Sequence, residues 1–254
     1  MRLNIDENQY ILTHEGVDLS IPIKAGANNV NAWYCDPVSI EPVISDQFIG
    51  DVNQGGNVNF KNIHLNPHGN GTHTECVGHI SAEPYTINQC LKEFHFYAKI
   101  ITVKPTSFWN ESFKEDDLII DKDQLKKATE NWSNEKALII RTLENTDVKK
   151  QKQYSNSNPA YITKAAMEYI NELGVDHLMV DMPSVDRELD NGELIGHKTF
   201  WNYPADPQIH KTISELIFVP NSLEDGTYLI QIQIMSIESD ASPSKIMAHR
   251  IHKS

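Results

Sequence analysis

The sequence has few cysteines and lacks the common zinc-binding spacings. Only Cys35, Cys76 and Cys90 occur among its 254 residues. An odd number of widely spaced thiols predicts reduced cysteines rather than a disulfide framework. Neither Cys-x-x-Cys nor His-Glu-x-x-His is present, so any metal site must be of another kind.

Positive charge and long apolar runs are also scarce. Lys and Arg number 22 against 35 Asp and Glu, a formal net charge of −13. This argues against a nucleic acid or an anionic membrane as partner, because binding phosphate groups needs a basic patch. No apolar run approaches the roughly 20 residues that cross a bilayer. The first residues also lack the apolar stretch of a secretory signal. We therefore expect a cytoplasmic protein that acts on a small molecule.

Nothing that resembles a linker divides the chain. A length of 254 residues is compatible with one large domain. The hydrophobic fraction of 39% is spread along the sequence, which fits a globular enzyme with polar surface loops rather than disorder. We expect residues 1–254 to form a single domain.

Residues 64–80 gather more candidate metal ligands than any other stretch. His68, His73 and His79 bracket the carboxylate of Glu75. Neutral imidazole and carboxylate are donors that hold a divalent ion such as Zn²⁺ or Mn²⁺. The alternative is a polar surface loop with solvated histidines.

The local backbone and a neighbouring thiol add to this picture. Gly69, Asn70 and Gly71 disfavour a helix, so the sequence predicts a tight loop that bends around an ion. Cys76 is a further candidate ligand, although it directly follows Glu75 and its side chain is therefore expected to point the other way.

This stretch resembles the signature His-x-Gly-Thr-His-x-Asp-x-Pro-x-His of the cyclase family of metal-dependent hydrolases, whose best known member is bacterial kynurenine formamidase. The matching residues are His68, Gly71, Thr72, His73, Glu75 and His79. The chain departs from the signature by one extra residue between His68 and His73. It also has Glu75 and Val77 where the family usually has Asp and Pro.

Three other segments resemble the family in the same order. They are Asp-Leu-Ser-x-Pro-Ile at 18–23, Pro-Ser-Val-Asp at 183–186 and Asp-Ala-Ser-Pro at 240–243. The resemblance implies that Trp33, the aromatic residue after the first segment, lines the substrate pocket. A loop tryptophan can equally pack at a subunit contact.

The resemblance also implies the metal ligands and a catalytic group. One ion is expected at His68, His73 and Glu75, and a second at Glu75, His197 and Glu215, with Glu75 bridging them. His79 is expected to transfer a proton to the leaving amine. A histidine packed beneath the loop is the alternative for His79.

The second site leaves a choice between two histidines. Extra residues at 201–207 separate His197 from Glu215, so His210 competes with His197 as the ligand. His210 can also simply face solvent before a helix-like segment at 211–217. His177 is expected to be structural, and the histidines at 249 and 252 are expected on the surface.

Periodicity predicts alternating strands and helices. A helix is expected after Asn158 as N-cap, with apolar residues at helical spacing up to Leu173 and an end at Gly174. Residues 141–158 are expected to be a mobile cover or a surface excursion. Strands are expected at 9–13, 56–65, 96–104, 117–121, 137–142, 177–181, 227–237 and 245–251, and a further helix at 122–132.

The resemblance also implies the fold, the assembly, the metal content and the activity of the protein. It implies an α/β fold with a mixed sheet of the swivelling β/β/α type, assembled as a homodimer or homotetramer, with one or two divalent ions per subunit, Zn²⁺ before Mn²⁺. The expected activity is hydrolysis of a small amide, an aryl formamide such as N-formylkynurenine or a cyclic amide. The alternative is a non-catalytic metal-binding or structural protein that retains the fold.

Overall fold

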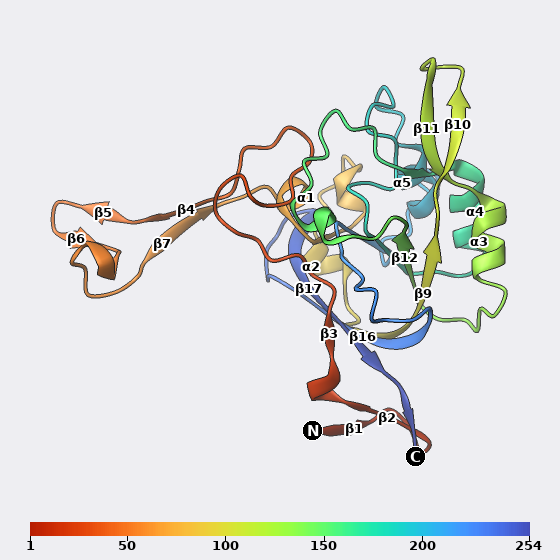
Figure 1. The fold of residues 1–254 in the computed structure, drawn as a ribbon, viewed down its shortest axis with the longest axis horizontal. Helices are drawn as coiled ribbons and strands as arrows, with labels where there is room; N and C mark the ends of the chain where they lie inside the picture. The colour runs from red at the N-terminus through yellow and green to blue at the C-terminus, as the bar shows by residue number, and fades with distance from the viewer.

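A closed ring of strands forms the centre of the fold (Figure 1). The computed structural model describes residues 1–254. Its largest sheet has eight strands, and because β16 pairs with both β9 and β17, all of them except β3 lie in the ring. In order, they are β16 (Gly226–Ile234), β9 (His95–Val103), β12 (Ala137–Thr142), β14 (His177–Val180), β15 (Thr212–Glu215), β8 (His73–Glu75), β17 (Ala241–Arg250) and β3 (Val17–Asp18).

The sheet is mixed, and the α/β class is confirmed. The strands β9, β12, β14 and β15 run parallel to one another, whereas β8, β16 and β17 pair antiparallel with their neighbours. β12 and β14 correspond to the strands predicted at 137–142 and 177–181, and their parallel pairing makes them, with the loop and helix between them, a β-loop-α-β unit.

Side chains of the buried strands alternate between two apolar clusters. On β12, Ile139 belongs to the cluster enclosed by the ring, whereas Leu138 and Ile140 belong to the cluster beneath the helices. A strand buried on both faces reads as a continuous apolar run, as residues 137–140 do. The covering helices, at the right of Figure 1, are α3 (Lys122–Ala128), α4 (Lys164–Glu172) and α5 (Ile195–Trp201).

Three helix predictions need correction. The helix predicted at 122–132 ends at Ala128. The helix predicted after Asn158 begins only at Lys164, because Thr163 is the residue whose side chain accepts from a backbone N–H of the first turn. The helix-like segment 211–217 instead contains β15, which is wholly buried between β14 and β8. Pairing on both sides of this segment overrides its local preference.

The loop over residues 141–158 is fastened to the body. It contains the short 3₁₀ helix η4 (Asp147–Gln151), and its Tyr154 is buried. The Lys149 ammonium donates to the buried carboxylate of Asp181 at 2.7 Å. The side chain of Lys149 therefore ties this loop, most of whose residues lie at the surface, to the end of β14.

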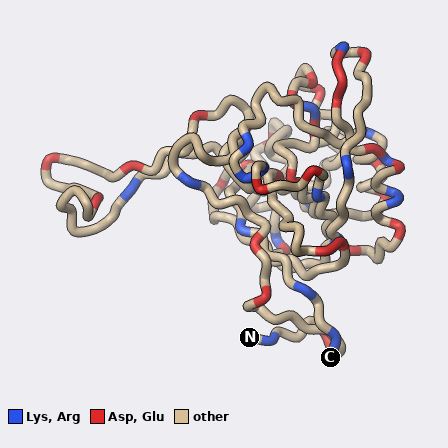
Figure 2. The backbone as a smooth tube through the Cα atoms, in the orientation of Figure 1, with Lys and Arg blue, Asp and Glu red and all other residues tan.

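A two-stranded arm projects from the body, at the left of Figure 1. It consists of β4 (Ser39–Pro42) and β7 (Lys61–His64), with β5 (Ile44–Ser45), β6 (Phe48–Ile49) and the 3₁₀ helix η2 (Val52–Gln54) at its tip. Most of the arm carries neither acidic nor basic residues (Figure 2). It exposes several large apolar side chains, among them Phe60 and Ile63.

The remaining elements are short. None of the helices combines the length and the hydrophobicity that crossing a membrane requires. The elements are β1 (Arg2–Asn4), β2 (Gln9–Leu12), η1 (Thr13–Glu15), α1 (Pro67–Asn70), η3 (Val77–His79), α2 (Ile87–Cys90), β10 (Thr106–Asn110), β11 (Glu115–Ile120), β13 (Tyr161–Ile162) and β18 (His252–Lys253).

Of two histidines outside the candidate site, His177 agrees with its prediction and His249 does not. His177 is buried, lies 2.8 Å from the Thr212 hydroxyl through Nδ1, and stacks on Phe96, which agrees with a structural role. His249 was expected on the surface but is buried, because the N-terminal segment around Gly16 packs against its ring.

Candidate metal centre

The central strand of the site is β8. His73 and Glu75 are two residues apart on this strand, so their side chains leave the same face of the sheet. Thr74 points to the other face, where its hydroxyl lies 2.7 Å from that of Ser214. All three residues are buried. The spacing His-x-Glu therefore places an imidazole and a carboxylate side by side on a rigid element.

His68 reaches the same carboxylate from a helical turn. The prediction of a non-helical loop is wrong here, because residues 67–70 form α1 with Asn66 as its N-cap and Pro67 in its first turn. His68 Nδ1 lies 3.1 Å from Glu75 Oε2. The extra residue between His68 and His73 is accommodated by this turn and does not move His68 away from the cluster.

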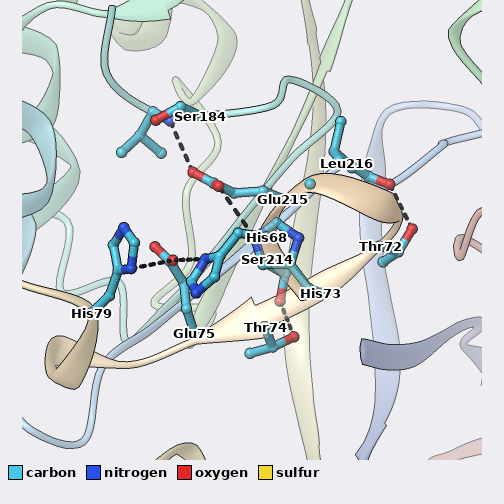
Figure 3. Close-up of polar contacts among 12 residues, drawn as sticks. His68, Thr72, His73, Thr74, Glu75, His79, Ser184, Ser214, Glu215 and Leu216 are labelled. Carbon is cyan, nitrogen blue, oxygen red and sulfur yellow. Dashed lines mark hydrogen bonds and ion pairs between the residues drawn. The ribbon is translucent and has the colours of Figure 1, made fainter. Parts of the chain in front are cut away.

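His73 carries an unsatisfied nitrogen. Its Nδ1 lies 3.0 Å from the Gly71 carbonyl oxygen, which holds the ring. Its Nε2 is buried, makes no hydrogen bond, and lies 3.4 Å from Glu215 Oε2 (Figure 3). A buried polar atom without a partner costs free energy unless something else binds it. Here the unsatisfied nitrogen lies beside a carboxylate oxygen, so the two atoms could be ligands of one ion.

His197 reaches Glu75 from α5. Its Nδ1 lies 2.5 Å from Asp186 Oδ2, and its Nε2 lies 3.0 Å from Glu75 Oε1 and 3.9 Å from Glu215 Oε1. Gly196 lets the helix come close, because a Cβ there would lie 2.8 Å from Asp186 Oδ1. A carboxylate that holds the outer nitrogen of a histidine is the usual support of a metal ligand.

The other two candidates lie away from this cluster. The His210 side chain is 56% exposed and pairs with Asp176, so the structure brings His197 rather than His210 to Glu75. Cys76 is buried in the core enclosed by the ring, where its Sγ lies 3.6 Å from the Tyr85 carbonyl oxygen. Cys76 directly follows β8 and packs in this apolar core rather than beside Glu75 in the histidine cluster.

The electrostatics of the cluster centre on Glu75. Burial raises the pKa of this carboxyl group. The neighbouring His79 and His197 lower the same pKa by a larger amount, so it lies well below the usual value. Burial lowers the pKa of His68, yet hydrogen bonds to Asp240 and Glu75 outweigh it and raise that pKa to about 10. The site thus favours a carboxylate surrounded by cationic or metal-binding groups.

A cavity of about 310 Å³ opens onto the cluster. Trp33 and His79 both line it, together with His68, His197 and Glu215. The His79 side chain is 31% exposed, so it lies at the wall of the cavity rather than packed beneath the loop. Its Nδ1 lies 3.8 Å from Glu75 Oε2 and 3.3 Å from Asp240 Oδ2.

The sequence alone did not single out Asp240 as part of the site. This residue precedes β17, and its Oδ2 lies 2.9 Å from His68 Nε2. The only signal was its place in the Asp-Ala-Ser-Pro segment. Asp186 was likewise known only as the last residue of Pro-Ser-Val-Asp. No local spacing links either residue to residues 68–79.

The donors fit a divalent ion. Each of three overlapping groups brings its ligand atoms within 4.8 Å of one another: His68, His73 and Glu75; Glu75, His79 and His197; and His68, His79 and Asp240. Imidazole nitrogens with carboxylate oxygens are a donor set for zinc or manganese. The unsatisfied Nε2 of His73 is the atom that a bound ion would satisfy.

The protein is a closed ring of strands that carries a histidine-carboxylate cluster. Comparison with known proteins identifies its family. Residues 17–187 match the family model described as "Putative cyclase". The chain belongs to this family. No curated protein sequence matches it.

Solved structures support the fold. The chain is similar to a potential metal-dependent hydrolase with cyclase activity, at 14% identity and a TM-score of 0.64, over 92% of this chain and 96% of the other. It is similar to a predicted metal-dependent hydrolase from Bacillus stearothermophilus, at 14% identity and a TM-score of 0.62, over 92% and 97%. It is also similar to isatin hydrolase A from Labrenzia aggregata, at 14% identity and a TM-score of 0.63, over 92% and 93%. These likenesses confirm the cyclase type of fold.

Proposed function

We propose that the protein is a metal-dependent hydrolase of small amides. The observation that carries this proposal is the buried Nε2 of His73, which has no hydrogen-bond partner and faces Glu215 beside Glu75 and His197. A cavity of about 310 Å³ gives a small molecule access to this cluster.

The residues present fit two neighbouring ion positions. His68, His73 and Glu75 would hold one ion, since their ligand atoms lie within 4.8 Å of one another. Glu75, His197 and Glu215 would hold the other, since His197 Nε2 lies 3.0 Å from Glu75 Oε1 and 3.9 Å from Glu215 Oε1. Zinc or manganese is the expected metal. When bound, such an ion lowers the pKa of a coordinated water from about 15.7 towards about 7 and polarises a carbonyl oxygen.

His79 supplies the proton that an amine leaving group needs. Its Nδ1 lies 3.3 Å from Asp240 Oδ2, and its Nε2 makes no hydrogen bond within the chain. The Nε2 atom is therefore the one that would give a proton to the leaving nitrogen. Imidazole suits this role because its ordinary pKa is close to neutrality.

The charged side chains of the cavity wall favour an uncharged substrate. Glu188 accepts hydrogen bonds from the backbone N–H groups of Asn156 and Asn158, and Arg187 pairs with Asp117. These groups are committed to the protein and do not remain to bind a charged ligand. Trp33 instead offers an aromatic face, which supports an aryl formamide or a cyclic amide as substrate. A structural neighbour described as an isatin hydrolase supports the same class.

Chelation and reconstitution test the proposal. The protein would be treated with a chelator, dialysed, and assayed on aryl formamides and cyclic amides before and after addition of zinc or manganese. We expect turnover to disappear with chelation and to return with metal. A protein that binds zinc or manganese but hydrolyses none of these compounds would instead be a non-catalytic metal-binding relative.

We also propose that the protein assembles from identical subunits through its arm. An isolated two-stranded hairpin is marginally stable in water. This arm nevertheless exposes Phe60 and Ile63 at 59% and 60% of their surface. Exposed apolar side chains gathered on one projecting element favour contact with a second copy.

A further inference from the structure

One oxygen of Asp240 contacts two histidines of the site. Asp240 Oδ2 lies 2.9 Å from His68 Nε2 and 3.3 Å from His79 Nδ1. The rings of these two histidines are also close to each other, with centroids 4.4 Å apart. The carboxylate therefore joins the residue expected to bind metal to the residue expected to move a proton.

The sheet fixes the position of Asp240. The next residue, Ala241, is the register partner of Glu75 on β8. The backbone N–H of Cys76 donates to the Asp240 carbonyl oxygen at 3.0 Å. The Ser239 hydroxyl donates to Oδ1 at 3.0 Å, which leaves Oδ2 for the histidines. Asp240 is thus held beside Glu75 by backbone pairing rather than by chance contact of a mobile side chain.

The histidines at the centre share one arrangement. Each presents one ring nitrogen towards Glu75 or Glu215 and has the other held from outside. Gly71 holds His73 and Asp186 holds His197, whereas the outer partner of His68 is Asp240. Metal-binding histidines usually have such an outer partner, which sets ring orientation and tautomer.

We propose that Asp240 is a positioning residue of the site, whose Oδ2 orients His68 for metal binding and His79 for proton transfer. The part concerning His79 rests on the proposed hydrolase function, whereas the part concerning His68 concerns metal affinity alone. With its Nδ1–H held by Asp240, His79 has its Nε2 turned free for the substrate. Loss of the carboxylate frees both rings at once.

Metal titration tests the first part. Zinc and manganese would be titrated by calorimetry into wild-type protein, Asp240→Ala, Asp240→Asn and the control Asp116→Asn, which removes an exposed carboxylate elsewhere. We expect about 10–100-fold weaker binding for Asp240→Ala, a smaller loss for Asp240→Asn, and no change for the control. Wild-type affinity in a folded Asp240→Ala protein would overturn the role at His68. Should Asp240→Ala fail to fold, Asp240→Asn decides, because its side chain has nearly the same shape.

Turnover at saturating metal tests the second part. We expect Asp240→Ala to lower kcat by up to about 10²-fold even when the site is filled, since the proton donor is no longer oriented. Adding Asp240→Ala to His79→Ala should then cost little more, because both act on the same proton transfer. An undiminished kcat in filled Asp240→Ala, or independent losses in the double variant, would overturn the link to His79.

A spectroscopic readout separates this inference from the proposed hydrolase function. In ¹⁵N-labelled histidine spectra, the His79 signals are those that vanish in His79→Ala. We expect Asp240→Ala to shift them towards a mixture of tautomers. Unchanged His79 signals would overturn the link even if no amide substrate were found.

Discussion

His73 and Glu215 are direct cross-strand partners. The antiparallel register of β8 and β15 pairs them, and His73 Nε2 lies 3.4 Å from Glu215 Oε2. Partners in a sheet leave the same face, so two short strands far apart in the sequence build the buried side of the site without any loop. The backbone of this side is held by pairing on both edges of β8.

We expect His73→Ala to lose most bound metal and nearly all turnover. Its Nε2 is the unsatisfied atom of the site, and its removal should weaken binding by more than the about 10–100-fold seen when an outer partner is lost. Elemental analysis after dialysis against zinc measures the change. The same substitution at the exposed His64 is the control. Full metal content in His73→Ala would remove β8 from the metal site.

We expect His197→Ala to lower the number of bound ions per chain, whereas His210→Ala leaves it unchanged. His197 lies 3.0 Å from Glu75, whereas His210 faces solvent beside Asp176. Metal stoichiometry at saturation distinguishes the two variants. The reverse result would move the second ion position towards residue 210.

We expect His79→Ala to retain metal and fold but to lose about 10²–10⁴-fold in turnover of an amide. An activated ester, whose leaving group needs no proton, should lose much less. Metal content, melting temperature and turnover would be measured on the same preparation. Loss of metal together with turnover would make His79 a ligand, as its place within reach of Glu75 and His197 also permits.

Acid should destabilise the protein in part through His177. Burial lowers the pKa of His177 to about 4 in the folded chain, so the unfolded chain binds its proton more tightly. The contribution of His177 to the free energy of unfolding is fully present above about pH 6.5 and is lost as the pH falls towards about 4. The difference between these two limits is about 3 kcal/mol. His177→Asn should therefore lose less of its unfolding free energy between pH 7 and pH 5 than wild type does. Denaturant unfolding at several pH values measures this. An identical pH dependence in the two proteins would contradict it, and His64→Asn serves as control.

We expect the double variant Phe60→Ser, Ile63→Ser to shift the assembly towards smaller species. Both side chains are exposed on the arm, where a second copy would cover them. Light scattering coupled to size exclusion gives the mass. Val148→Ser changes an apolar residue that is exposed elsewhere and should leave the mass unchanged. A monomeric wild type, or an unchanged mass in the double variant, would rule out the arm as the contact.

The sequence sufficed where the information was local. The spacing of His68, His73, Glu75 and His79 predicted a single cluster, because a few residues of chain can carry side chains only a short way apart. Buried strands such as β12 and β14 were also foreseeable, since continuous apolar runs are typical of a sheet covered on both faces.

The sequence misled where tertiary packing overrides local preference. Residues 211–217 carry a helix-like pattern, yet they contain β15 because neighbouring strands pair with both edges of this segment. His249 has no local mark of burial and is covered only when the N-terminal segment folds over β17.

The sequence by itself therefore determined the chemistry of the site, namely which donors lie near Glu75 on residues 68–79. Only the tertiary structure decided which distant groups complete it. It brings His197 rather than His210 close to Glu75, through α5. It also places Glu215 and Asp240 beside β8, because closure of the ring pairs β8 with β15 on one edge and with β17 on the other. That closure depends on strand register across the whole chain, and no short stretch of sequence encodes it.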